Sequence, residues 1–285
     1  MKKQTGILLA TGLAFIATSA TANAADDLVL RPTRSDIVTA NNQVNFNVSG
    51  AYLDYLESSG STRLDSEKGW TPGLSLSGSV MTDLAIENLY LYGQLSWNKG
   101  NSNYVGSYMN GQYGDVRQSD KAEIFNEDFR IGKGFAMSDD FMVTPYLGLG
   151  ARQWSRKITN PGGYQEDYSH GYAGGGVMVQ FSPGPGWVLS VNGLIGSTFA
   201  ASMRTSLTSG GAALTPQTYN LGNAAIYMAG ISIDRAITDT IHANVGVDYL
   251  NFRYGRSPVS SLDSTYEPDS RTSQVALKAG LGFSF

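Results

Sequence analysis

The chain has 285 residues, a formal net charge of −4 and no cysteine. Without cysteine it has no disulfide framework, thiolate metal site or cysteine nucleophile, and with a small net charge and no Lys/Arg cluster it lacks a footprint for nucleic acid. Charged residues make up 15% of the chain and 34 residues are glycine, whereas soluble domains average about 25% charged residues and about 7% glycine. This composition excludes a typical soluble enzyme and, because aromatic residues are abundant, a disordered protein.

The first 24 residues have the features of a secretory signal peptide. Lys2 and Lys3 form a positive region, residues 7–17 are apolar, and Ala22-Asn23-Ala24 is a small-residue cleavage site, so we expect the exported product to begin at Ala25. A membrane anchor would need about 20 apolar residues, which this run does not provide. Residues 25–41 are predicted to be a periplasmic N-terminal tail, followed by one domain over residues 42–285.

From residue 42 onward the sequence repeats one pattern, in which apolar and polar residues alternate and turn residues follow. The last segment illustrates it, since alternate positions there form one apolar face: Val275, Leu277, Ala279, Leu281, Phe283 and Phe285. A period of two indicates β-strands. Because no second apolar run is long enough for a membrane-spanning helix, a protein of this kind that stays in a membrane must be a barrel.

Short and long connections alternate between the predicted strands. The short ones lie at residues 82–88, 136–140, 182–186 and 236–240, and the long ones at 57–68, 99–120, 158–168, 202–218 and 255–270. This arrangement predicts an all-β protein, a closed antiparallel transmembrane barrel of ten strands, with short periplasmic turns and longer outside loops. Eight strands are the alternative, because the first hairpin is rich in glycine and least regular.

Aromatic residues on the apolar face gather at two heights. We expect a lower girdle of Phe135, Phe141, Phe181 and Trp187 near the short turns and an upper girdle of Tyr52, Trp97, Phe199 and Tyr249. The strand from Trp187 to Phe199 is about 40 Å long, which a tilt of about 45° reduces to roughly 28 Å, close to the apolar thickness of an outer membrane. A secreted soluble barrel with the apolar face inward is the alternative, but its water-facing side should carry more Lys and Glu.

With this signal peptide, these strands and a last segment that ends on Phe285, the chain resembles the bacterial outer-membrane β-barrel proteins. The resemblance implies a location in the cell outer membrane and contact with its lipid and lipopolysaccharide. It also implies that barrel-insertion machinery reads Val275, Leu277, Leu281, Phe283 and Phe285 as an assembly signal. The glycine-rich strands and Tyr-rich loops are similar to the small opacity and surface-antigen barrels.

Two families of barrel enzymes differ from this chain at their motifs. Ten strands match the omptin proteases, but the chain lacks their Asp-x-Asp and Asp-x-His elements, since Tyr168 and Thr240 stand two positions before the two histidines, His170 and His242. The His-x-Ser element of the lipid A deacylases is also missing. We therefore expect no catalytic residues, no cofactor and no bound metal.

Strand parity places a set of ionisable residues on the lumen face: Asp128, Arg130, Arg152, His242, Asp248 and Lys278. Asp248 and Lys278 are expected to meet near mid-barrel as a salt bridge. Paired charges of this kind either fill a narrow lumen or form a charged constriction that selects a solute. The first supports an envelope or surface protein that acts through extracellular loops, and the second a small porin-like channel.

Three further features are expected to be unremarkable solvated loop elements. His170, with Glu166 and Asp167 nearby, is predicted to be a solvated loop histidine. Asp263, Glu267 and Asp269 lack the spacing of a calcium-binding loop. Residues 101–114, rich in Tyr, Gly, Ser and Asn, have the composition of an adaptable binding loop or of any interfacial loop, and the sequence does not identify an extracellular ligand.

Overall fold

The computed structural model describes residues 35–107, 111–158, 164–206, 208–209, 212–213, 216–261 and 264–285. The predicted signal peptide and most of the predicted tail lie outside these residues. One short helix, α1 (Asp36–Ala40), precedes the strands. The long strands are β1 (Gln43–Ser59), β2 (Thr62–Thr82), β3 (Leu89–Gly106), β4 (Val116–Lys133), β6 (Phe141–Ile158), β7 (Gln165–Gly184), β8 (Trp187–Ser206), β12 (Ala225–Ala236), β13 (Ile241–Tyr254) and β14 (Asp269–Ser284). Four short strands, β5 (Phe135–Ser138), β9 (Thr208–Ser209), β10 (Ala212–Ala213) and β11 (Gln217–Asn220), extend the connections.

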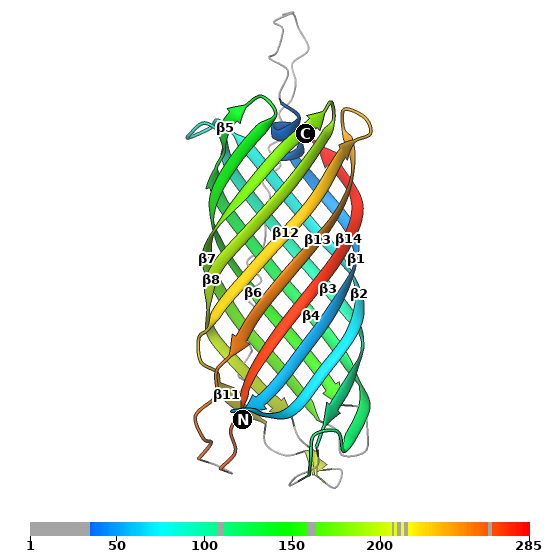
Figure 1. The fold of residues 1–285 in the computed structure, drawn as a ribbon, viewed down its shortest axis with the longest axis vertical. Coiled ribbons are helices and arrows are strands. Elements are labelled where there is room, and N and C mark those ends of the chain that lie inside the picture. The colour runs from blue at the N-terminus through cyan, green and yellow to red at the C-terminus, as the bar shows by residue number, and fades with distance from the viewer. Residues whose placement is uncertain are drawn as a thin grey trace, which may run out of the picture. The chain divides into compact units, whose positions relative to one another are not determined.

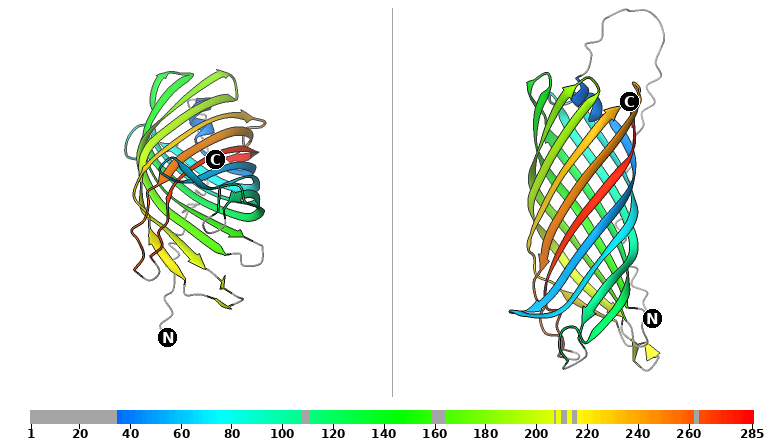
Figure 2. Two further views of the ribbon diagram at one scale, coloured as in Figure 1. Left: turned by 60° about the horizontal axis from the view of Figure 1, so that its bottom comes forward. Right: turned by 45° about the vertical axis from the view of Figure 1, so that its right-hand side comes forward.

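The long strands form a closed antiparallel barrel (Figure 1). Each pairs with its neighbours in the chain, and β14 pairs with β1 from Gln43 opposite Ser284 to Ser58 opposite Asp269, which leaves no free edge. Ten strands therefore make the wall within the described residues, as predicted, and the eight-strand alternative is wrong. The turned views in Figure 2 show the same continuous wall of strands.

The two ends of the barrel differ. At the terminal end, where β1 begins and β14 ends, short turns lie where the sequence predicts them. At the opposite loop end the strands extend well into the predicted long connections 57–68, 99–120 and 202–218, so those boundaries were wrong, whereas the described residues of 255–268 form a connection as predicted. Residues 57–68, for example, form a tight hairpin in which β1 reaches Ser59, β2 starts at Thr62, and Gly60 adopts a φ of 61°. The ladder continues because backbone hydrogen bonds do not depend on the polarity of the side chains.

The outer surface carries the apolar residues and the lumen carries the polar ones. Phe46 is 53% exposed and Leu147 68% exposed, whereas the lumen residues Asn47 and Thr144 are 3% and 0% exposed. A soluble barrel would show the opposite arrangement, so that alternative is wrong. The described residues include no helix of the length and apolarity needed to cross a bilayer.

The predicted girdle residues lie on the outer surface, most of them exposed: Phe135, Phe141, Phe181 and Trp187 near the terminal end, and Tyr52, Trp97, Phe199 and Tyr249 nearer the loop end. The sequence analysis missed Trp70, which is exposed on β2 with its ring 5.5 Å from that of Tyr52. It was missed because residue 70 adjoins a segment interpreted as a loop. We call the residues beyond the upper girdle, in the strands and in the connections between them, the loop-end section. Its outer surface carries accessible charged side chains such as Lys68, Lys99 and Glu123, so it lies beyond the apolar band of the barrel wall.

Candidate functional site in the barrel lumen

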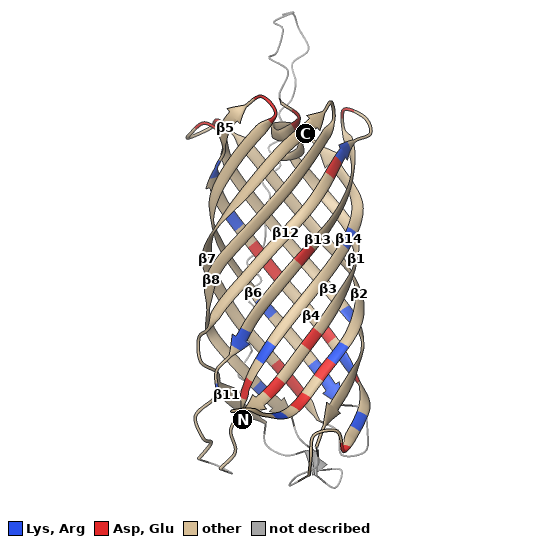
Figure 3. Ribbon diagram, in the orientation of Figure 1, with Lys and Arg blue, Asp and Glu red and all other residues tan. Residues whose placement is uncertain are grey.

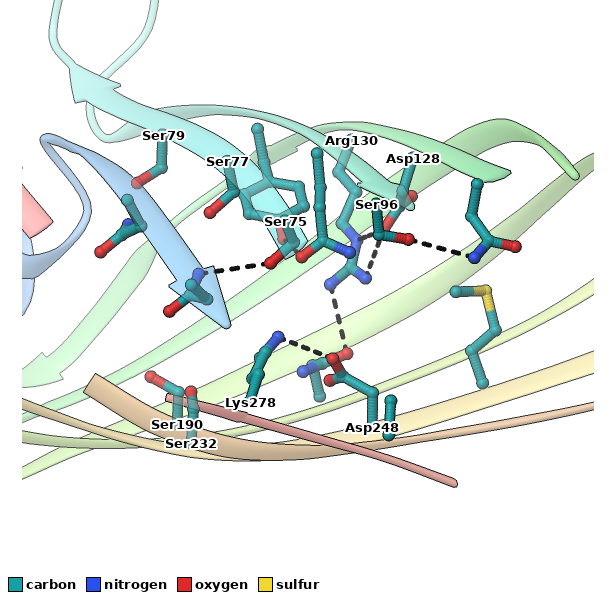
Figure 4. A pocket seen from close by; sticks show the side chains of 18 of the residues that line it. Ser75, Ser77, Ser79, Ser96, Asp128, Arg130, Ser190, Ser232, Asp248 and Lys278 are labelled. Atoms are coloured by element: carbon teal, nitrogen blue, oxygen red, sulfur yellow. Dashed lines mark hydrogen bonds and ion pairs between the residues drawn. The ribbon is translucent and has the colours of Figure 1, made fainter. Parts of the chain in front are cut away.

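The middle of the lumen contains a cavity of about 210 Å³ (Figure 4). Serine, asparagine and glutamine side chains make up much of its lining, including Ser75, Ser77, Ser79, Ser96, Ser190, Ser232, Asn45, Asn47, Asn126, Asn192, Asn244, Gln94 and Gln274. Five of the six ionisable residues expected in the lumen also line it: Asp128, Arg130, Arg152, Asp248 and Lys278. Tyrosine, methionine and aliphatic side chains, among them Tyr90, Tyr92 and Met178, complete the lining, so the cavity combines polar groups and charges with apolar surface.

The mid-lumen charges lie in two ion pairs. Lys278 Nζ is 2.7 Å from Asp248 Oδ2, and Arg130 Nη2 is 2.6 Å from Asp128 Oδ2. Arg130 also donates to Asn192 Oδ1 over 3.2 Å, which joins β4 to β8. Figure 4 shows these groups reaching into the same space. The first pair is the more exposed, with Asp248 38% accessible at its side chain, whereas Asp128 and Arg130 are 6% and 11% accessible.

Arg152 makes a second connection across the lumen, nearer the loop end. Its guanidinium donates to Asn126 Oδ1 over 2.7 Å and to Gln274 Oε1 over 2.9 Å, so it links β6 and β4 with β14 on the other side. The partners are neutral amides, which satisfy donors without neutralising the charge. The Arg152 side chain therefore crosses the lumen and is held in place by hydrogen bonds at its far end.

The terminal end is closed by α1, which Figure 1 shows at the mouth of the barrel. Ser35 caps the helix through its hydroxyl, and Asp36 Oδ2 accepts from Gly186 N over 2.9 Å, which ties the helix to the turn before β8. Ile37 is 1% exposed in an apolar cluster with Met81 and Val188. Residues 35–41 therefore pack into the terminal end of the barrel and do not extend from it as a tail. We call these residues the plug.

On the lumen side of α1, hydrogen-bonded polar side chains also fill the terminal end of the barrel. Asn41 and Gln180 exchange hydrogen bonds of 2.7 and 3.2 Å. His242 Nδ1 lies 2.5 Å from Asp234 Oδ1, and Gln43 donates to the other oxygen of that carboxylate over 3.1 Å. His242, expected among the lumen charges, is therefore buried beside Asp234 near the terminal end, away from the mid-lumen pairs.

An aromatic layer closes the loop end. The rings of Tyr55 and Trp154 lie 5.0 Å apart, those of Trp154 and Tyr168 5.1 Å, and those of Tyr168 and Tyr254 5.7 Å. These residues come from β1, β6, β7 and β13, so the layer spans the lumen. Leu53, Ile124, Met203 and Phe252 belong to the same buried cluster.

Arg156 lies within this layer and is surrounded by carboxylates. Its Nε is 2.6 Å from Glu166 Oε2, its Nη2 is 3.2 Å from Asp65 Oδ2, and its Nη1 is 3.7 Å from Glu67 Oε2. The guanidinium also faces the ring of Tyr55 at 5.3 Å. The sequence analysis missed this cluster because its acidic members fell in predicted loops. The alternation at Asp65-x-Glu67 and Glu166-x-Tyr168-x-His170 was the available signal.

His170 was predicted to be a solvated loop residue, and that prediction is wrong. It is 3% exposed, its Nδ1 is 2.7 Å from the Tyr254 hydroxyl, and its ring is 4.6 Å from that of Phe252. Position 170 shares strand parity with Glu166 and Tyr168 and faces inward because β7 begins at Gln165. The histidine is therefore part of the closed layer.

The acidic residues near β14 separate in the structure. Asp263 lies outside the described residues, Asp269 accepts from the Arg256 backbone over 2.9 Å, and Glu267 accepts from the Tyr168 hydroxyl over 2.6 Å inside the barrel. No group of three acidic or histidine side chains among the described residues is arranged to hold a metal ion. Of residues 101–114, positions 108–110 lie outside the description, and Tyr104 is buried and faces inward.

Comparison with known proteins relates the chain to outer-membrane barrels by fold. No protein-family model matches it, and no curated protein sequence matches it. The structure is similar to the outer membrane protease OmpT from Escherichia coli, with a TM-score of 0.59 and 9% identity over 86% of this chain and 98% of that chain. The Pseudomonas putida toluene transporter TodX gives a TM-score of 0.38 at 9% identity, covering 89% of this chain and 93% of that one. The NalP translocator domain from Neisseria meningitidis gives 0.36 at 12% identity, covering 88% and 91%.

At these identities the comparisons establish a fold and not an activity. The protein is a closed ten-stranded antiparallel barrel of the outer-membrane type.

Proposed function

We propose that this protein is a non-conducting, non-enzymatic barrel of the bacterial outer membrane, which acts as an envelope or surface protein through its loop end. In this arrangement the terminal end faces the periplasm and the loop end faces the outside. Its partners are outer-membrane lipid and lipopolysaccharide, with the barrel-insertion machinery during assembly.

The observation that carries the proposal is that side chains cross the lumen at successive levels. α1 occupies the terminal end, and Arg130 hydrogen-bonds to Asn192 at the middle. Arg152 hydrogen-bonds to Gln274 nearer the loop end, and the aromatic layer with Arg156 lies at the loop end itself. A barrel of this size is only slightly wider than the eight-stranded kind, whose interior side chains fill the lumen. To pass, an ion would have to displace the buried groups at both ends of the barrel.

The alternative is a small porin-like channel, favoured by the cavity of about 210 Å³ at mid-lumen. Its hydroxyl and amide lining and its two ion pairs would suit a hydrated solute. The cavity, however, lies between the two closures, so conduction would require both to open.

The support for a non-enzymatic role comes from how the loop-end groups are paired. Asp65 and Glu67 face Arg156, and His170 is paired with Tyr254 and not with a carboxylate. Within the described residues the histidine that contacts a carboxylate is His242, which lies beside Asp234 and is buried at the terminal end. None of these pairs combines a base and a carboxylate at the accessible mouth.

Conductance of the purified barrel in a planar bilayer tests the proposal. We expect no steady steps from the wild type, from Asp248→Ala or from Lys278→Ala, while a porin added to the same membrane conducts. Ohmic steps whose size or ion preference changes in the two variants would establish a channel. Cleavage of a peptide library that disappears in His170→Ala would contradict the non-enzymatic role.

A further inference from the structure

Charged residues of both signs are frequent in the loop-end section, which is the lower part of the barrel in Figure 3. The acidic residues that face inward there are buried around one cation. Six acidic residues there are each no more than 8% exposed: Glu57, Asp65, Glu67, Asp120, Glu166 and Glu267. They come from β1, β2, β4, β7 and the segment before β14. Arg156 on β6 is the cation that ion-pairs with them among the described residues.

Arg156 cannot compensate all of these groups. It forms ion pairs with Asp65, Glu67 and Glu166. Asp120 is 0% exposed, and neither of its carboxylate oxygens has a hydrogen-bond partner. A buried carboxylate without partner or counter-charge is strongly unfavourable, so the cluster needs protons or bound cations to remain closed.

The hydrogen-bond geometry favours protons. The Tyr168 hydroxyl lies 2.6 Å from Glu267 Oε1, 3.1 Å from Glu166 Oε2 and 3.3 Å from the Tyr55 hydroxyl, which in turn lies 3.3 Å from Glu57 Oε2. Each tyrosine hydroxyl carries a single proton and an ionised carboxylate carries none. The two tyrosine hydroxyls together can donate only two of these four hydrogen bonds. Protonated carboxyl groups can donate the remaining ones.

Bound metal fits the arrangement less well. Apart from Asp120, the carboxyl groups contact separate partners, namely the guanidinium, the tyrosine hydroxyls and, for Glu67, the Ser102 hydroxyl. Among the described residues no three acidic groups converge as metal ligands.

We propose that this carboxyl cluster is a proton-dependent closure of the loop end: retained protons hold the aromatic layer shut, and their loss drives the carboxylates apart and opens it. The inference rests on the closed loop end that the proposed function invokes, but not on the absence of conduction. A protein that conducts would fail the bilayer test and could still open in this way.

The groups that face the cluster come from every packed element. They are Tyr55 and Glu57 of β1, Asp65 and Glu67 of β2, Tyr104 of β3, Asp120 of β4, Arg152 and Arg156 of β6, Tyr164, Glu166, Tyr168 and His170 in and before β7, Tyr254 of β13, and Glu267. Apart from the two arginines this set contains acids, tyrosines and one histidine held beside Tyr254. Deprotonation therefore adds charge of a single sign.

Burial sets the direction of the pH dependence. It raises the pKa of Glu67 to about 7, that of Asp120 to about 6 and that of Glu267 to about 8. In the open form, with water around them, these groups return toward ordinary carboxyl values. The closed form thus holds more protons, so its advantage is complete below the ordinary carboxyl pKa and is lost as pH rises through the raised values.

Trp154, which is 2% exposed within the aromatic layer, is the natural reporter. The other tryptophans, Trp70, Trp97 and Trp187, are exposed on the outer surface and can be replaced by phenylalanine. We expect acrylamide quenching of Trp154 to be low at about pH 5 and to increase several-fold by about pH 9. In the Glu67→Gln, Asp120→Asn, Glu267→Gln variant we expect low quenching throughout.

Two controls separate the closure from other effects. Asp54→Asn with Glu123→Gln removes exposed carboxylates of the same section, and we expect it to keep the wild-type rise. If the triple variant does not fold, Asp120→Asn alone should move the midpoint to higher pH. The proposal is overturned if wild-type quenching does not change with pH, if wild type and the neutralised variants rise together, or if EDTA opens the closure at low pH and Ca²⁺ restores it at high pH.

Discussion

Arg156 on β6 and Glu166 on β7 stand directly opposite each other in the ladder, and their side chains meet at 2.6 Å inside the barrel. The guanidinium thereby becomes the counter-charge for an acidic cluster and also part of the aromatic layer that closes the loop end. Stability and closure of this end therefore depend on the same residue.

Replacing Arg156 should strongly destabilise the barrel. Arg156→Met leaves several buried carboxyl groups without their cation, and breaking a buried ion pair in this way costs about 3–5 kcal/mol. Equilibrium unfolding by urea in detergent micelles measures the loss. Adding Glu166→Gln to Arg156→Met should recover part of it, and a double variant as unstable as the single one would contradict the charge argument.

The two mid-lumen ion pairs should differ in strength. Asp128→Asn leaves Arg130, 11% accessible, without its partner and should cost about 3 kcal/mol. Asp248→Asn removes a carboxylate that is 38% accessible and should cost about 1 kcal/mol or less, because water screens it. If the two variants lose the same free energy of unfolding in this assay, burial does not determine how much each ion pair contributes to stability.

The helical plug can be tested by thiol labelling, since the chain has no natural cysteine. Ala40→Cys places a thiol in the buried cluster at the terminal end and should react slowly with a maleimide. Adding Ile37→Asp, which puts an unpaired charge at a position that is 1% exposed, should release the helix and speed the reaction at least tenfold. Rapid labelling in both backgrounds would mean that α1 does not close this end.

Assembly should depend on Phe285, the exposed residue that follows the alternating face of β14. Deleting it should lower the amount of folded, heat-modifiable protein in the outer membrane, because the terminal strand closes the barrel against β1. The matched control is the substitution Ser284→Ala, which keeps the chain length and changes a residue on the opposite face of β14. Unchanged levels in the deletion variant would show that the terminal aromatic residue is dispensable.

The sequence alone determined the wall of the barrel. Strand parity is a local property, so the outward positions of Leu277, Phe283 and Trp187 and the inward positions of Asp128 and Lys278 followed from alternation over a few neighbours. The meeting of Asp248 with Lys278 was also foreseeable, because the two residues lie at similar distances from the terminal end on neighbouring strands.

Only the tertiary structure decided what fills the lumen. Asp65 and Arg156 meet although β3 and β4 separate their strands, and Arg152 reaches Gln274 on the far side of the barrel. Such contacts depend on the number of strands, their tilt and their stagger around the closed wall, which no local pattern specifies. The loop-end residues were misread for a related reason: beyond the membrane a strand no longer needs an apolar face, so its alternation of polar residues resembles a loop until the ladder that holds it is seen.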